Sequence, residues 1–235
     1  MSQEHLFTTR ERMAFDHVFY GDDPRLVNTG QPFTVTNVNV TPAIVNQDAY
    51  DLPMVSMAGA GAATDGHNHQ WSDAGYQLHP GKTVYFYTEL ASADITNHDY
   101  AVWYSALGTT PITSLPTDYI GIRKLSGETR FRLVSRKASG TELAIDLNMP
   151  VVANDTLYCF GGAFTLDLTT AGKARAQIFY GVGLSPGGQM TKCWDDYVMT
   201  QAPDTVDLAF QRAWRAGSTV TTVGLFGGCR FWADA

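Results

Sequence analysis

The region that most limits the possible fold is residues 118–149, where side chains alternate between apolar and polar across two turns. Lys124-Leu125-Ser126-Gly127 and Lys137-Ala138-Ser139-Gly140 carry the same turn signature. The apolar positions are Phe131, Leu133, Leu143, Ile145, Leu147 and Met149, and the opposing positions are Arg130, Arg132, Glu142, Ala144, Asp146 and Asn148. A period of two between Ser-Gly turns predicts three antiparallel strands with one buried and one solvated face. We therefore expect an all-β protein.

The chain after residue 83 is rich in further runs of strand length. We expect strands over 83–91, 100–107, 156–168, 174–184, 206–214 and 219–232, with a kink or bulge at Gly161-Gly162 and a loop over 185–204. Strands do not alternate with helices in this pattern, so a parallel α/β sheet is unsupported. The spacing predicts an antiparallel β-sandwich.

The first eighty residues follow a different pattern. We interpret residues 1–30 as an N-terminal extended arm and residues 31–235 as a single β-sandwich domain. Prolines in 31–57 are typical of edge strands. The small and turn-forming residues of 58–80 predict a flexible loop.

Charge and composition narrow the classes of partner. The formal net charge of −7 argues against nucleic acid and against an anionic membrane as partners. No stretch approaches the roughly 20 apolar residues of a membrane helix, and the first residues do not resemble a secretory signal. Six basic residues gather on the strands described first, and we interpret them as a solvated face: Arg123, Lys124, Arg130, Arg132, Arg136 and Lys137. The three cysteines are widely spaced, which is typical of small core residues in a reducing compartment.

Motifs for catalysis or metal binding are weak. His67-x-His69, with His79 and Asp65 nearby, is the best metal candidate, but it lacks a third ligand at a diagnostic spacing. We interpret these as polar loop histidines and expect no metal and no cofactor. A glycosidase needs two carboxylates across a cleft. Asp195 and Asp196 are candidates for one of them, and the possible partners are Glu89, Asp94, Glu128, Glu142 and Asp146. No nucleophile elbow is present, so we expect a protein that is not an enzyme.

Aromatic residues supply the remaining candidates. Trp71 and Trp194 fall in predicted loops, where an indole ring can stack on a sugar, so we name them as candidate ligand-binding residues. Phe15, Phe19 and Tyr20 lie in the predicted arm, and we name them as candidate interface residues because exposed aromatics mark contact surfaces.

The segment 118–149, followed by LYCFGGAFTLDL, RAQIFYGVG and the closing FQRAWRAGSTVTTVGLFGGCRFWADA, resembles virion structural proteins of tailed phages. The resemblance covers residues 80–235 and consists of alternation patterns rather than chemical motifs. It implies a jelly-roll or concanavalin-like sandwich and a capsid decoration (cement) protein. It brings no catalytic residue.

The resemblance also implies partners and a location. The partners would be the major capsid protein and copies of the chain itself, most simply a homotrimer, on the exterior of a virion assembled in the host cytoplasm. The alternative is a carbohydrate-binding module or receptor-binding fibre protein that takes a surface glycan. A sandwich-fold glycan hydrolase is the third hypothesis.

Overall fold

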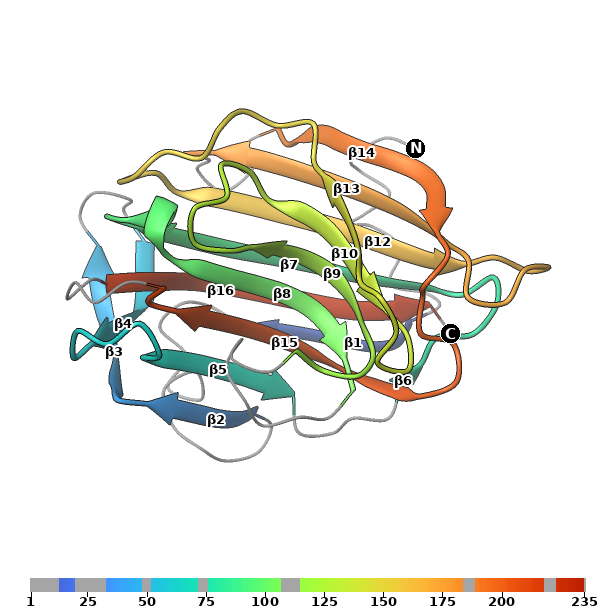
Figure 1. The fold of residues 1–235 in the computed structure, drawn as a ribbon, viewed down its shortest axis with the longest axis horizontal. Coiled ribbons are helices and arrows are strands. Elements are labelled where there is room, and N and C mark those ends of the chain that lie inside the picture. The colour runs from blue at the N-terminus through green and yellow to red at the C-terminus, as the bar shows by residue number, and fades with distance from the viewer. Residues whose placement is uncertain are drawn as a thin grey trace.

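The structure is a computed structural model, and it describes residues 13–19, 33–47, 52–71, 76–106, 115–183, 189–217 and 223–234. Over these ranges the chain forms two antiparallel sheets that pack face to face (Figure 1). The described part contains one short 3-10 helix, η3 (Ile95–Asn97), and no helix there is long and apolar enough to cross a membrane. The prediction of an all-β antiparallel sandwich is confirmed.

Sheet A has eight described strands: seven follow the order β14-β13-β12-β7-β16-β4-β3, and the eighth, β1, pairs with β16. The bounds are β14 (Thr191–Met199), β13 (Ala174–Val182), β12 (Tyr158–Leu166), β7 (Thr83–Ser92), β16 (Val223–Asp234), β4 (Leu52–Gly59), β3 (Val40–Gln47) and β1 (Met13–Phe19). The strand from the predicted N-terminal arm therefore joins the sheet beside the last strand of the chain. The predicted boundary at residue 30 lies outside the described residues.

Sheet B has eight described strands: seven follow the order β11-β10-β9-β8-β15-β5-β2, and the eighth, β6, pairs with β15. The bounds are β11 (Leu143–Asp146), β10 (Arg132–Arg136), β9 (Tyr119–Lys124), β8 (Asp99–Ser105), β15 (Asp207–Arg215), β5 (Gly66–Trp71), β2 (Phe33–Val38) and β6 (Tyr76–Gln77). The three predicted strands of 118–149 are β9, β10 and β11, in register as neighbours.

The core lies between the two sheets and is built from alternate residues of their strands. Its large rings come from both sheets and include Phe33, Phe86, Tyr100, Tyr104, Phe131, Phe160, Phe164, Phe210, Trp214 and Phe231. Burying one such side chain contributes about 1.5–3 kcal/mol, so this layer is the main source of stability.

The outward face of sheet B is not simply solvated, which corrects one expectation. Ala101, Trp103, Tyr119, Val134 and Ala213 form a second buried cluster there. The predicted alternation on β10 and β11 is present, but the sheet is covered on both sides near its middle.

Two predicted loops contain strands. Gly66–Trp71 of the expected 58–80 loop form β5, which is buried along its whole length, and Thr191–Met199 of the expected 185–204 loop form β14. Polar side chains with partners inside the protein replace the usual apolar alternation in β5, so hydropathy did not reveal it.

The predicted kink at Gly161-Gly162 is absent. β12 pairs with both β7 and β13 through these glycines without a register shift. Gly162 is required for another reason, since a Cβ there would collide with the ring of Phe86. The glycine makes room for a core aromatic rather than for a bend.

Candidate functional site

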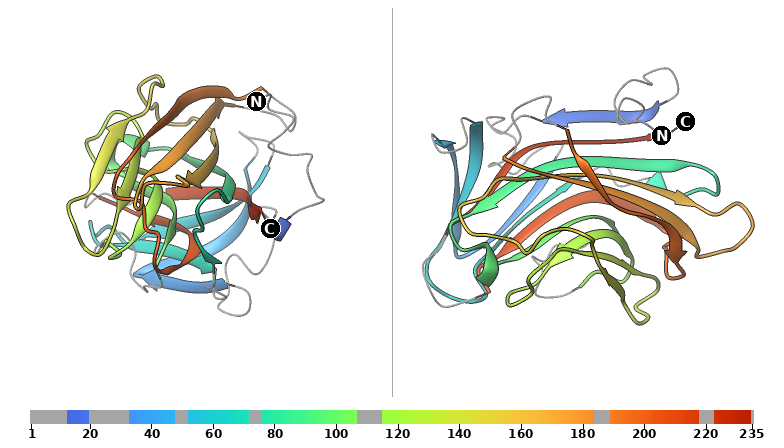
Figure 2. Two further views of the ribbon diagram at one scale, coloured as in Figure 1. Left: turned by 90° about the vertical axis from the view of Figure 1, so that its right-hand side faces the viewer. Right: turned by 90° about the horizontal axis from the view of Figure 1, so that it is seen from above.

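Both sheets bend in the same sense, and the outward face of sheet B lies on the inside of the curve (Figure 2). We call this surface the concave face. Because side chains alternate along a strand, the residues next to the inward core positions of β5, β15, β8 and β9 point to it. It collects polar and aromatic side chains from segments far apart in the sequence.

The centre of the concave face is a hydrogen-bonded row across β5, β15 and β8. Gln211 donates through Nε2 to Asn68 Oδ1 at 2.6 Å. Its Oε1 accepts from the indole Nε1 of Trp103 at 2.8 Å and from the hydroxyl of Ser105 at 2.5 Å. Asn68 Nδ2 has no hydrogen-bond partner in the structure. A buried amide donor without a partner is uncommon in folded proteins.

The row continues onto β9. The ring of Trp103 lies 4.8 Å from that of Tyr119, centroid to centroid, and Gly121 leaves the space that Trp103 fills. The hydroxyl of Tyr119 donates to Glu142 Oε1 at 2.6 Å, and Arg123 binds the same carboxylate through both terminal nitrogens. We call this connected set the concave-face row; its members are Asn68, Gln211, Trp103, Ser105, Tyr119, Arg123 and Glu142.

The row is enclosed at its centre and open at its margins. Asn68 is 0% exposed and Trp103 and Gln211 are each 1% exposed. Outward residues at the sheet margins, such as Thr36 on β2 and Asp146 on β11, are partly or fully exposed. A ligand would therefore reach the row from the edges of the face.

The hydroxyl of Tyr119 is held as a hydrogen-bond donor. Burial and the hydrogen bond to Glu142 raise the pKa of Tyr119, so its hydroxyl is a donor and not a base at neutral pH. The carboxylate of Glu142 receives this bond and two more from Arg123. This arrangement suits binding better than proton transfer.

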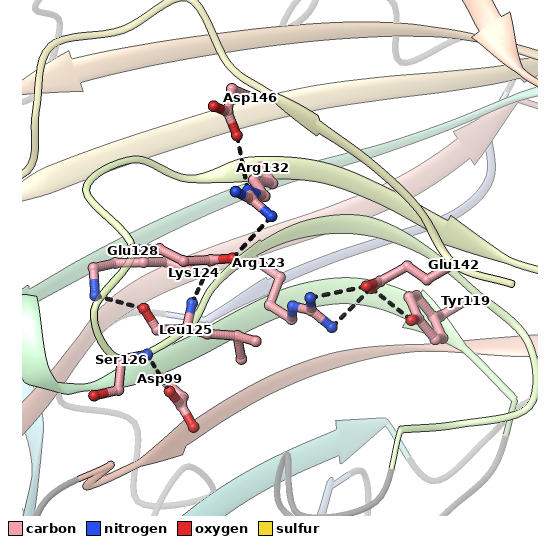
Figure 3. A network of polar contacts seen from close by, with 10 residues as sticks. All are labelled: Asp99, Tyr119, Arg123, Lys124, Leu125, Ser126, Glu128, Arg132, Glu142 and Asp146. Carbon is pink, nitrogen blue, oxygen red and sulfur yellow. Dashed lines mark hydrogen bonds and ion pairs between the residues drawn. The ribbon is translucent and has the colours of Figure 1, made fainter.

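The basic residues of β9 and β10 have partners within the protein (Figure 3). Arg132 bridges Glu128 and Asp146, and Lys137 pairs with Asp204. Lys124 does not face solvent, since its Nζ donates to the carbonyls of Thr96, His98 and Leu125, all at 3.1 Å. The predicted solvated basic face is thus corrected to a set of local ion pairs and one buried lysine.

His67 and His69 point to the same side of β5, as the spacing predicts, but into the sandwich. The two Nε2 atoms lie 2.8 Å apart, and His67 Nδ1 lies 2.5 Å from Asn37 Oδ1. Arg212 Nη2 approaches His69 Nδ1 at 3.4 Å. Asn37 Oδ1 accepts from His67 Nδ1, and Arg212 donates to His69 Nδ1. Both imidazoles are therefore neutral and belong to one hydrogen-bonded chain that runs from Arg212 to Asn37. No group of three potential metal ligands exists among the described residues.

The two candidate tryptophans lie in strands. Trp71 faces the core and contacts the rings of Phe33 and Phe231 at 5.4 and 5.1 Å. Trp194 lies on β14, half-buried against the core, and its Nε1 has no hydrogen-bond partner. Neither belongs to the concave-face row, and ligand binding by them stays a prediction.

The candidate carboxylates do not converge on a cleft. Burial alone would raise the pKa of Asp195, but hydrogen bonds from Lys192, Arg175 and Gln177 lower it to about 2. Asp195 is on sheet A, whereas Glu142 and Glu128 are on the sheet B side and are tied to arginines. The structure brings none of these pairs together across a shared site.

The candidate interface residues are only partly described. Phe15 and Phe19 lie in β1, opposite Ala233 and Cys229 of β16, and Tyr20 lies outside the described residues. Their role in an interface stays a prediction.

Asn68, Gln211 and Trp103 were not identified as site residues from the sequence. Asn68 and Gln211 are 143 positions apart, and only the strand order β5-β15 makes them neighbours. A useful signal was present in β15, where Gln211 and Arg212 interrupt the apolar residues of 208–214.

Comparison with known proteins identifies the fold but finds no family for this chain. No family model and no curated protein matches this chain. Among solved structures, it resembles arcelin-5, a lectin-like defence protein of Phaseolus vulgaris, with 9% identity over 93% of this chain and 98% of that one and a TM-score of 0.56.

Two further structures extend the comparison. The exoplasmic/lumenal domain of VIP36, in a form with Ca²⁺ and Man2, matches with 10% identity over 88% and 84% of the two chains and a TM-score of 0.53. The alginate lyase vAL-1 from Chlorella virus matches with 10% identity over 89% and 96% and a TM-score of 0.55. The chain therefore has a concanavalin-like, lectin-type β-sandwich, a fold that carries both binding proteins and enzymes.

Proposed function

We propose that this chain is a carbohydrate-binding protein that takes saccharide on the concave face of sheet B. The observation that carries the proposal is the concave-face row, in which two amides, an indole and a phenol form one connected set across four strands. Lectin-type neighbours, one of them solved with a mannose ligand, agree with it.

The chemistry of the row fits hydroxyl-rich ligands. Amide side chains donate and accept, as sugar hydroxyls do, and aromatic rings offer an apolar surface beside them. Among the described residues, Asn68 Nδ2 is a buried donor that has no hydrogen-bond partner. Few convergent polar groups on a largely apolar surface are typical of small-molecule sites.

Glycan-array screening followed by calorimetry tests this function. Thr36→Val, at the partly exposed margin opposite Asn68, and Asn68→Ala should each weaken binding of the glycans that the unaltered protein takes. Gln177→Ala is the matched control, since it removes an amide from the outward face of sheet A. Equal binding by all variants, or no glycan binding at all, would reject the proposal. Near-UV circular dichroism confirms that each variant is folded.

A catalytic role is the second possibility, because alginate lyases share the fold. The raised pKa of Tyr119 keeps its hydroxyl protonated and hydrogen-bonded to Glu142, which favours binding over catalysis. Incubation with acidic and neutral polysaccharides should release no new reducing ends, and measurable cleavage that Tyr119→Phe abolishes would overturn the non-catalytic assignment.

The capsid decoration role is a separate proposal that rests on the sequence resemblance alone. It requires the chain to be present on purified virions and to bind empty capsids. Absence of the chain from such particles would end it.

A further inference from the structure

Glu142 occupies an unusual position for a salt-bridge partner of Arg123. Glu142 directly precedes β11, the edge strand of sheet B, whereas Arg123 is on β9, and β10 lies between them. The carboxylate thus extends over a whole strand to reach its partners (Figure 3). It lies at the margin of the concave face from which a ligand would approach.

Three donors converge on this carboxylate. Arg123 Nη1 lies 2.7 Å from Oε1, Arg123 Nη2 lies 2.8 Å from Oε2, and Tyr119 donates its hydroxyl to Oε1 at 2.6 Å. A bidentate guanidinium with one further donor is the geometry by which proteins recognise the carboxylate of a ligand. Tyr119 also packs against the ring of Trp103, and Arg123 lies on the same strand, β9, which pairs with β8.

The carboxylate is the most accessible member of the set. The side chain of Glu142 is 19% exposed and that of Arg123 is 6% exposed, whereas Tyr119 is fully buried. Arg123 Nε is buried and has no partner, so the guanidinium keeps one donor that Glu142 does not satisfy. A ligand with an oxygen beside its carboxylate can use this donor, as the ring oxygen of a uronic acid would.

We propose that Arg123 and Tyr119 form a carboxylate subsite in which Glu142 takes the place of the carboxylate of an acidic saccharide. This proposal rests on the carbohydrate-binding function and specifies its ligand class as saccharides that contain uronic acid. Glu142 swings out when the ligand binds, and it lowers the apparent affinity by holding the subsite closed. The exchange of one carboxylate for another keeps the buried arginine paired throughout.

Rescue by a small carboxylate tests the subsite without any sugar. Thermal unfolding of Glu142→Ala is followed in sodium acetate and in sodium chloride of equal ionic strength. Acetate should raise the Tm of this variant by a few degrees, because it binds only the folded state. The unaltered protein and Glu142→Ala/Arg123→Gln should show no difference between the two salts. The same Tm in acetate and chloride for Glu142→Ala would overturn the subsite. If that variant does not fold, Glu142→Gln replaces it in the same comparison.

Calorimetry with digalacturonate and with its neutral methyl ester tests the ligand class. Glu142→Ala should bind the acid about 10-fold more tightly than the unaltered protein does, with no change for the ester, since only the internal competitor is removed. Equal gains for both ligands would contradict a carboxylate subsite. Ester binding without an acetate effect overturns the subsite and keeps the carbohydrate function. An acetate effect without saccharide binding supports the subsite and overturns the carbohydrate function.

Discussion

Trp103 and Gln211 connect two neighbouring strands of sheet B through a buried hydrogen bond of 2.8 Å from the indole to the amide oxygen. Gln211 also accepts a hydrogen bond from the Ser105 hydroxyl and donates one to Asn68 Oδ1. One side-chain amide is thus the hydrogen-bond partner of three side chains. Both the enclosure of the concave face and its polar character depend on this residue.

Loss of the Gln211 amide should be costly. Gln211→Ala leaves the Trp103 indole, the Ser105 hydroxyl and the Asn68 carbonyl without their partner in a buried setting, which should lower the free energy of unfolding by about 2–4 kcal/mol. Urea denaturation followed by tryptophan fluorescence measures this loss. Gln177→Ala, on the outward face of sheet A, should change stability by less than about 0.5 kcal/mol. Similar losses for the two variants would contradict the assigned role.

The two adjacent glycines of β12 should respond differently to alanine. A Cβ at Gly162 collides with the Phe86 ring, so Gly162→Ala should destabilise by about 1–3 kcal/mol. The nearest atom to a Cβ at Gly161 is the Met190 methyl at 3.6 Å, an ordinary contact, so Gly161→Ala should be close to neutral. Chemical denaturation of both variants gives the comparison. A destabilised Gly161→Ala would indicate that backbone bending matters here after all.

The repeated turn signature predicts two equal turns, but the structure shows two different ones. In the first turn Gly127 has a positive φ of 81°, whereas in the second Ala138 and Ser139 have φ of 49° and 59° and Gly140 does not. Glu128 N bonds Leu125 O in the first, and Gly140 N bonds Lys137 O in the second. The second turn therefore carries two residues that disfavour the left-handed region.

Relief of this strain should stabilise the protein. Ser139→Gly removes the Cβ from a left-handed position and should raise the free energy of unfolding by about 1 kcal/mol. Ser126→Gly, at the equivalent sequence position in the first turn, gains no such relief and serves as the control. The urea midpoints of Ser139→Gly and Ser126→Gly, each compared with that of the unaltered protein, measure the two effects. Equal effects would show that the two turns have the same conformation in solution.

Acid should destabilise the fold through its interior histidines. Burial, reinforced by the charge of Arg212, lowers the pKa of His67 to about 3, and burial lowers that of His98 to about 4. In the unfolded chain both take up a proton near the ordinary imidazole pKa of 6.5, so stability is full above that pH and falls as the pH drops toward the folded values.

The expected loss near pH 5 is about 2 kcal/mol for each of these two histidines. His67→Gln should make the dependence of stability on pH shallower between about pH 6.5 and 4, because one of the two linked protons is removed. Denaturation at several pH values provides the slopes. An unchanged slope in the variant would mean that His67 is not held neutral.

The fold could be predicted where strands bury apolar side chains. The alternation through Phe131 and Leu133 places β10, and the aromatic runs place β7 and β8. β5 escaped detection because its inward positions are His67 and His69, which are buried through hydrogen bonds with each other and with Asn37. Hydropathy cannot distinguish such a strand from a polar loop.

The candidate site could not be predicted from the sequence for a related reason. Its residues are ordinary polar members of separate strands, and only the order β5-β15-β8-β9 brings Asn68 near Tyr119. Glu142 was considered as a catalytic carboxylate, but its ion pair with Arg123 depends on a side chain that spans a strand. Neither the proximity of Asn68 to Tyr119 nor the ion pair of Glu142 with Arg123 can be predicted from residues that are close together in the sequence.

The positions of β15 and β16 have a consequence for biosynthesis. These last two strands occupy interior places in the two sheets, since β15 lies between β8 and β5 and β16 lies between β7 and β4. Until both have left the ribosome, β5 and β2 have no link to the rest of sheet B, and β4 and β3 have none to the rest of sheet A. The nascent chain therefore exposes several unpaired strand edges until β15 and β16 have been made, and such edges can pair with other chains.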